Sequence, residues 1–209
     1  MKLILNNHKP GAARLGQASE DYMTNGNEID SYSENGTKKE WNSKNDVTNK
    51  MIKLDTPLQP GESVSLSIDW HFDVSKQSGR EGAILENTFF LAYFYPRVAV
   101  YDDYMGWDTM TFFGMQEFYN DFNDYEISVN VPEDFIVWST GDLLNAEEVL
   151  QKKYAKKLEK SMQSNEVIRI ATPEDLQKKE ITKDGNNTCT RKAPNSTEVA
   201  MTISHDYTR

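Results

Sequence analysis

Two adjacent aspartates, Asp102 and Asp103, form the residue pair of this 209-residue chain best suited to acid/base or cation chemistry. Two carboxylates that converge on one point can share a proton or hold a cation. Neighbouring residues of an extended strand point to opposite faces, so these side chains converge only if a turn intervenes. The sequence therefore favours a structural role, in which one aspartate binds Arg97 or caps backbone amides.

The other reactive side chains do not form a recognisable catalytic or metal-binding motif. His8, His71 and His205 lie far apart in the sequence, and none belongs to a close ligand pairing such as His-Glu-x-x-His. His71 falls on the polar side of an alternating segment, which indicates an exposed or hydrogen-bonded histidine. Cys189 is the one cysteine, so no internal disulfide can form. We therefore predict neither catalytic residues nor a metal site within this chain.

Composition and charge limit the classes of partner. With a formal net charge of -10 and 37% hydrophobic residues, the chain can build a core but repels phosphate backbones and anionic lipid heads. The sequence has no stripe of Lys and Arg with interleaved aromatic residues and no run of 18 apolar residues. We therefore predict no nucleic-acid partner and no membrane segment.

Alternation of apolar and polar residues predicts a mainly β fold, with antiparallel sheets in a saddle-like or sandwich arrangement. The strongest alternation covers residues 64–74, 125–131 and 199–203. Pro132 ends the second of these segments, because proline cannot donate to a strand ladder. Shorter strands are expected at residues 2–5, 51–54, 89–95, 135–139 and 167–171.

One amphipathic helix is predicted over residues 145–164, where apolar side chains recur every fourth residue. Asn145 and Glu148 are expected to form its capping box, and its lysine run is interpreted as a solvated face. A short second helix should begin at Pro173, after the cap Thr172. Loose segments are expected at residues 16–49 and 183–197, which are rich in Asn, Ser and Gly.

The aromatic stretch "AYFYPRVAVYDDYMGWDT", residues 92–109, resembles part of the N-terminal β domain of aminopeptidase-N-like zinc metallopeptidases, the gluzincin exopeptidases, and especially their bacterial branch. In that family an aromatic-Pro-Arg segment is followed by a strand that ends in Val-Pro and by another that closes on Ser-x-Gly. This chain carries Tyr95-Pro96-Arg97, then the strand that ends at Val131-Pro132, then Ser139-Thr140-Gly141. The match covers about residues 91–145, and more weakly most of the chain.

The resemblance implies a single, noncatalytic N-terminal β domain over residues 1–209, expected to be a fragment of a longer, exported or periplasmic zinc aminopeptidase. In such proteins this domain lies against a catalytic domain that carries the zinc, and helps to form the substrate entrance. Glu86 is the nearby acid expected to contact the amino terminus of a peptide substrate. The residues expected at the interdomain seam are Tyr95, Arg97, Asp102, Asp103 and Trp107. No cofactor is expected in this chain itself, and zinc is expected in the catalytic domain.

Two alternatives stay open at this point. The aromatic residues of the stretch could form a core rather than a seam. The chain could also be an independent β-sandwich module that binds carbohydrate or protein through exposed Trp and Tyr rings. A His-Glu-x-x-His motif encoded beyond Arg209 would favour the peptidase domain.

Overall fold

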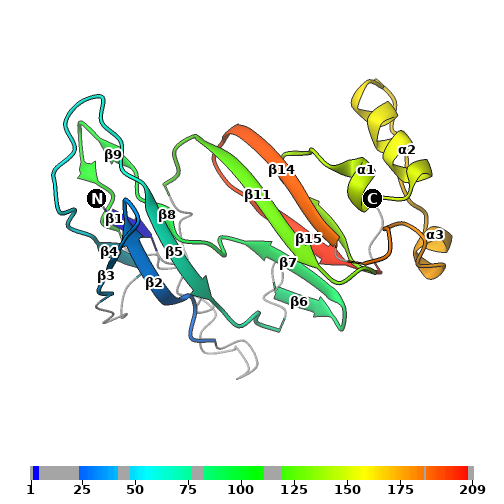
Figure 1. Ribbon diagram of the computed structural model, residues 1–209, viewed down its shortest axis with the longest axis horizontal. Helices are drawn as coiled ribbons and strands as arrows, with labels where there is room; N and C mark the ends of the chain where they lie inside the picture. The colour runs from blue at the N-terminus through cyan, green and yellow to red at the C-terminus, as the bar shows by residue number, and fades with distance from the viewer. Residues whose placement is uncertain are drawn as a thin grey trace. The chain divides into compact units, whose positions relative to one another are not determined.

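The computed structural model describes residues 2–4, 24–41, 48–76, 82–110, 119–185 and 187–206. In these ranges the chain is mainly β, as predicted, with antiparallel strand pairs and three helices (Figure 1). The chain divides into two compact units. The single N-terminal domain expected over residues 1–209 stays a prediction. Unit 1 contains Met1–Ser78 and Tyr93–Asp121, and unit 2 contains Gly79–Ala92 and Phe122–Arg209.

Unit 1 is built from short strands. They are β1 (Lys2–Ile4), β2 (Glu28–Glu34), β3 (Thr37–Lys39), β4 (Asn49–Met51), β5 (Leu66–His71), β8 (Arg97–Val98), β9 (Tyr101–Asp102) and β10 (Gly106–Trp107). They pair in the orders β3-β2-β5, β4-β1-β8 and β10-β9. In the described part of this unit, Tyr32 and Ile52 form a small buried cluster against which Trp41, Leu66 and Ile68 pack.

A hairpin lies inside the segment that was predicted to be loose. Strands β2 and β3 pair around Asn35 and Gly36, which have φ angles of 48° and 79°. Two central residues with positive φ make the tight turn that matches the twist of paired strands, and Asn-Gly is its usual sequence. The prediction of a loose segment over residues 16–49 is therefore wrong for residues 28–39, while residues 16–23 and 42–47 lie outside the described ranges.

Strand β5 keeps the predicted alternation but is shorter than residues 64–74. Leu66 and Ile68 are half-buried and alternate with exposed Ser67 and Asp69. Further along, Trp70 is 36% exposed, so the apolar face is covered less toward the end of the strand.

Unit 2 holds the larger sheets and all described helices. Its strands are β6 (Gly82–Leu85), β7 (Thr88–Ala92), β11 (Asn123–Val131), β12 (Ile136–Ser139), β13 (Asp142–Leu143), β14 (Asn187–Ser196) and β15 (Ala200–Ser204). They pair in the orders β12-β15-β7-β6 and β11-β14-β13. The helices are α1 (Ala146–Val149), α2 (Lys152–Met162) and α3 (Pro173–Gln177). One core cluster joins both sheets to the helices, with Val131, Val137, Tyr154 and Cys189 among its buried members.

Strand β14 is the main correction in unit 2, because its residues fall in the second segment predicted to be loose. It pairs with β11 along most of its length and buries alternate side chains, Asn187, Cys189, Arg191 and Ala193. The Arg191 guanidinium donates to the carbonyl oxygens of Val137 (2.7 Å) and Gly141 (3.1 Å). Since polar residues occupy half of its buried positions, the strand lacks the apolar alternation that sequence reasoning uses.

The predicted helix over residues 145–164 is interrupted. Leu150 is extended, forms a β-bridge with Thr182, and separates α1 from α2. The Asn145 side chain does not cap α1. It binds strand β14 instead, where its Oδ1 accepts from Thr190 N and its Nδ2 donates to Thr188 O, both at 2.9 Å. The expected strand at residues 167–171 is also absent, and Val167 is fully exposed.

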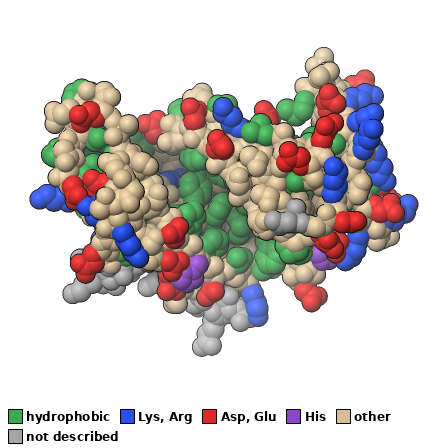
Figure 2. All heavy atoms as spheres, in the orientation of Figure 1, with side chains coloured by type: hydrophobic (Ala, Val, Ile, Leu, Met, Phe, Trp, Pro, Cys, Tyr) green, Lys and Arg blue, Asp and Glu red, His purple; other side chains and the backbone are tan. Residues whose placement is uncertain are grey.

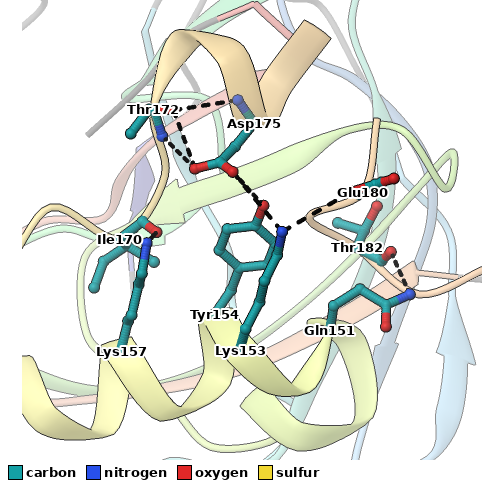
Figure 3. A network of polar contacts seen from close by, with 9 residues as sticks. All are labelled: Gln151, Lys153, Tyr154, Lys157, Ile170, Thr172, Asp175, Glu180 and Thr182. Atoms are coloured by element: carbon teal, nitrogen blue, oxygen red, sulfur yellow. Dashed lines mark hydrogen bonds and ion pairs between the residues drawn. The ribbon is translucent and has the colours of Figure 1, made fainter. Parts of the chain in front are cut away.

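Helix α3 begins as predicted and is tied to α2. Thr172 Oγ1 accepts from Asp175 N at 3.2 Å, and Asp175 Oδ2 accepts from Thr172 N at 3.0 Å. The hydroxyl of buried Tyr154 donates to Asp175 Oδ1 at 2.8 Å (Figure 3). This hydrogen bond lowers the pKa of Asp175, and burial raises the pKa of Tyr154.

Candidate functional site

The five residues expected at a seam all lie in unit 1, in two neighbouring parts of the chain. Tyr95 and Arg97 belong to the segment that leads into β8, and Asp102, Asp103 and Trp107 belong to the β9–β10 hairpin. Of these five, only Asp103 is exposed. The other four are half-buried, so they are neither fully core nor fully surface residues.

The aromatic-Pro-Arg segment is anchored to β5 and the residues after it. The Trp70 indole donates to the carbonyl oxygen of Phe94 at 3.2 Å, and the rings of Phe72 and Phe94 are 6.2 Å apart. Phe94 also meets Tyr95 edge to face, with ring centres 5.3 Å apart. These contacts hold the segment in a defined place on unit 1.

Arg97 lies against the aromatic face of Tyr93. Its guanidinium carbon lies 5.7 Å from the centre of the Tyr93 ring, within the range of a cation–π interaction. Tyr93 has a φ angle of 55°, an uncommon backbone conformation for a residue other than glycine.

Asp102 holds the turn of the β9–β10 hairpin. Its Oδ1 accepts from the backbone amides of Tyr104 (3.0 Å) and Met105 (2.6 Å). Gly106, which has a φ angle of 72°, closes the turn. Amide capping, one of the two structural roles expected for the aspartate pair, is observed for Asp102, and Asp103 lies exposed in the turn.

The hairpin presents apolar side chains to solvent. Tyr104 is 90% exposed, Met105 is 74% exposed and Tyr101 is 61% exposed. The Tyr101 ring packs edge to face on half-buried Trp107, with ring centres 5.0 Å apart. We call Tyr101, Tyr104, Met105 and Trp107 the hairpin surface. Clustered exposed apolar side chains are typical of interaction sites.

Carboxylates lie within the hairpin, at Asp102 and Asp103, and directly after it, at Asp108. The Tyr119 hydroxyl lies 3.4 Å from Asp102 Oδ2, and the negative charge of Asp102 raises the pKa of Tyr119. Asp108 Oδ1 accepts from Met110 N at 3.0 Å, and Asp108 N donates to Val100 O at 2.8 Å. A partner of this surface would therefore combine apolar groups with hydrogen-bond donors or positive charge.

Glu86 belongs to unit 2. It is exposed in the turn between β6 and β7, and its side chain makes no hydrogen bond or ion pair with the residues that the structure describes. Its contact with a substrate amine stays a prediction.

His71 and Cys189 have structural surroundings. His71 is exposed, and its Nδ1 lies 3.0 Å from both carboxylate oxygens of Asp30, which raises the pKa of the imidazole through hydrogen bonding. Cys189 is buried in β14, which raises the pKa of its thiol. Within the described ranges, no group of three or more His, Cys, Asp or Glu residues could hold a metal ion.

The seam prediction named Trp107 of the hairpin surface, and Tyr101 and Tyr104 belong to the aromatic stretch singled out in the sequence. Met105 was not singled out, although an apolar residue directly before Gly106 in a turn is an available signal for an exposed apolar side chain.

No helix in the described part of the chain is long and apolar enough to cross a membrane.

Comparison with known proteins identifies no relative of this chain. No family model matches this chain, and no curated protein or solved structure matches it. The mainly β class rests on the structure itself, and the aminopeptidase resemblance rests on the sequence motifs given above.

Proposed function

We propose that this chain is a noncatalytic β domain of a larger zinc aminopeptidase, and that it docks on the catalytic domain through the hairpin surface. The observation that carries the docking proposal is the exposure of Tyr101, Tyr104 and Met105 on one short hairpin. The peptidase assignment is supported by the order of the aromatic-Pro-Arg, Val-Pro and Ser-x-Gly motifs.

The hairpin surface is suited to docking because its turn backbone and its Tyr101–Trp107 ring pair are held in place before a partner arrives. Asp102 caps the turn amides, and Tyr101 packs on Trp107. Side chains that are already ordered lose less conformational entropy on binding. Tyr and Met are also enriched in protein interfaces, where their apolar area becomes buried.

In this proposal the chain shapes the substrate entrance and performs no bond cleavage. The zinc and the groups that activate water belong to the catalytic domain. Glu86 is the candidate for an ion pair with the substrate's amino terminus, a role for which its exposed carboxylate is available.

The first test concerns the gene and the isolated chain. The open reading frame should encode His-Glu-x-x-His within about one domain's length after Arg209, and the isolated chain should contain no stoichiometric zinc by elemental analysis. A reading frame without that motif, or hydrolysis of an aminoacyl anilide by the isolated chain, would refute the proposal.

The second test concerns docking. We expect the double variant Tyr104→Ala/Met105→Ala to bind the separately expressed catalytic polypeptide at least about tenfold more weakly, with little change in its own unfolding midpoint. The matched control is Leu58→Ala, which truncates a side chain that is 44% exposed elsewhere in unit 1. Equal losses for both variants would remove the hairpin surface as the docking site.

An independent carbohydrate-binding module is the second candidate, favoured by the exposed rings of Tyr101 and Tyr104. Flat aromatic rings can stack on sugars. Isothermal titration with oligosaccharides separates the candidates: saturable binding that Tyr104→Ala abolishes would support this module and oppose the docking domain.

A further inference from the structure

The outer side of helix α2 carries a row of lysines. Lys152, Lys156 and Lys160 are exposed and lie four residues apart, so successive lysines advance by about 6 Å along the helix axis. Figure 2 shows Lys and Arg side chains gathered over this helix. We call these three residues the α2 lysine row.

The α2 lysine row differs from the other lysines of the helix, which have partners within unit 2. Lys157 Nζ donates to the carbonyl oxygen of Ile170 at 3.2 Å. Lys153 Nζ lies 3.9 Å from carboxylate oxygens of Asp175 and Glu180 (Figure 3). No described residue forms an ion pair or side-chain hydrogen bond with the amino groups of the α2 lysine row.

The arrangement is unfavourable for the isolated helix. Lysines at i and i+4 repel each other, and Lys152 lies in the first turn, where the helix dipole favours negative charge. That first turn contains no acidic residue. In a chain whose net charge is -10, this local concentration of positive charge does not come from overall composition.

Most of the apolar side of helix α2 is used inside unit 2, and Met162 at its end is the exposed large apolar residue of the helix (63%). Tyr154 and Ala155 are buried in the core of unit 2, and Leu158 packs against it. A helix that binds in a membrane interface must bury its own apolar face in lipid, and here only Met162 is left for that contact. Between its lysines the row also has neither Arg nor an exposed aromatic ring, the groups that stack on nucleobases.

We propose that the α2 lysine row is a docking site for an acidic polypeptide segment whose carboxylates are spaced by one helical turn. Charge complementarity is the basis of this assignment: a Glu row at i, i+4 and i+8 repeats the spacing of the lysines. Binding would also remove the repulsion between neighbouring lysines. This inference is independent of the aminopeptidase proposal.

The test uses the full chain and a fluorescein-labelled, helix-forming peptide with glutamate at every fourth position. We expect saturable binding by fluorescence anisotropy at low ionic strength, and its loss at about 0.5 M salt. The same peptide with glutamine in place of glutamate should not bind.

The variant is Lys152→Gln/Lys156→Gln/Lys160→Gln, which should weaken binding by about tenfold or more. The matched control, Lys38→Gln/Lys53→Gln/Lys192→Gln, removes the same charge from exposed positions elsewhere and should stay within about twofold of the unmodified chain. Circular dichroism checks that both variants keep the native fold.

Three outcomes would overturn the inference. They are equal weakening by both triple variants, absence of binding to the glutamate peptide, and tighter binding to phosphatidylserine vesicles or single-stranded DNA than to that peptide. The first would assign the effect to net charge, and the third would assign the row to a different class of partner.

Discussion

Gly141 follows β12 at a position where both backbone conformation and space exclude a side chain. Its φ is 87°, and an added Cβ would lie 2.6 Å from the carbonyl oxygen of Lys192. We expect Gly141→Ala to lower the free energy of unfolding by more than about 2 kcal/mol, measured by urea denaturation. Gly185→Ala is the control, because Gly185 also has positive φ (99°) but no atom within 4 Å of an added Cβ. Equal losses would leave only backbone strain as the cause.

The pair of His71 and Asp30 predicts a pH dependence. Asp30 raises the pKa of folded His71, so the stabilisation is fully present below the unfolded pKa of about 6.5 and is lost as pH rises through the higher folded value. NMR titration should place the His71 pKa above that of the denatured chain, and Asp30→Asn should lower it. An unchanged titration in Asp30→Asn would contradict this assignment.

At the scale of elements, the hydrogen bond from Tyr154 to Asp175 joins α2 to α3, beside the ion pair of Lys153 with Asp175. Tyr154→Phe removes the donor to the Asp175 carboxylate, and we expect a loss of about 1–2 kcal/mol in unfolding free energy, measured with urea. Tyr101→Phe is the control, because Tyr101 is 61% exposed and should lose almost nothing. A similar small change in both variants would show that this hydrogen bond contributes little to stability.

Acid should weaken the same link. The folded pKa of Asp175 is depressed, so its contribution is present above the unfolded pKa of about 4 and is lost as pH falls through the folded value. The stability difference between the unmodified chain and Tyr154→Phe should therefore shrink in strong acid. A constant difference down to about pH 2 would contradict the role of the carboxylate.

At the scale of the whole molecule, the two units should differ in stability. The described buried cluster of unit 1 centres on Tyr32 and Ile52, whereas that of unit 2 joins two sheets and three helices. We expect amides of β2 and β5 to exchange hydrogen faster than those of β11 and β14, measured by mass spectrometry. Uniform protection would indicate that both units open together.

The thiol of Cys189 gives an independent probe of unit 2. It is buried in β14 and its pKa is raised by burial, so a thiol reagent should react only when unit 2 opens. Its rate of modification should therefore follow the hydrogen exchange of β14. Fast modification of the native chain would show that this strand opens easily.

Sequence patterns predicted the elements whose buried face is apolar or whose cap is local. Strand β11 buries Val131 and half-buries Tyr125, Ile127 and Val129 in strict alternation, as expected. The Thr172 cap of α3 also formed as predicted, because its partner lies three residues away. The Asn35-Gly36 turn is also a local signal, because Asn-Gly is the usual sequence of such a turn. It was not predicted, because residues 16–49 were interpreted from their composition alone.

The candidate site was predicted in part. The sequence indicated the aromatic stretch and a capping role for one aspartate. It did not decide which rings are exposed, because Tyr and Trp occur both in cores and at interfaces. The choice of Asp102 over Asp103 depends on the hairpin register, in which Gly106 pairs with Asp102.

The sequence by itself determined the mainly β class, because period-two alternation is a local property of each segment. Only the tertiary structure explains why Asn187–Ser196 form strand β14 and why the helix predicted from Asn145 is interrupted at Leu150. Buried Arg191 is tolerated because the carbonyls of Val137 and Gly141 accept its hydrogen bonds, and Leu150 is extended because Thr182 pairs with it. Those partners lie 32 to 54 residues away in the sequence, so no local pattern encodes them.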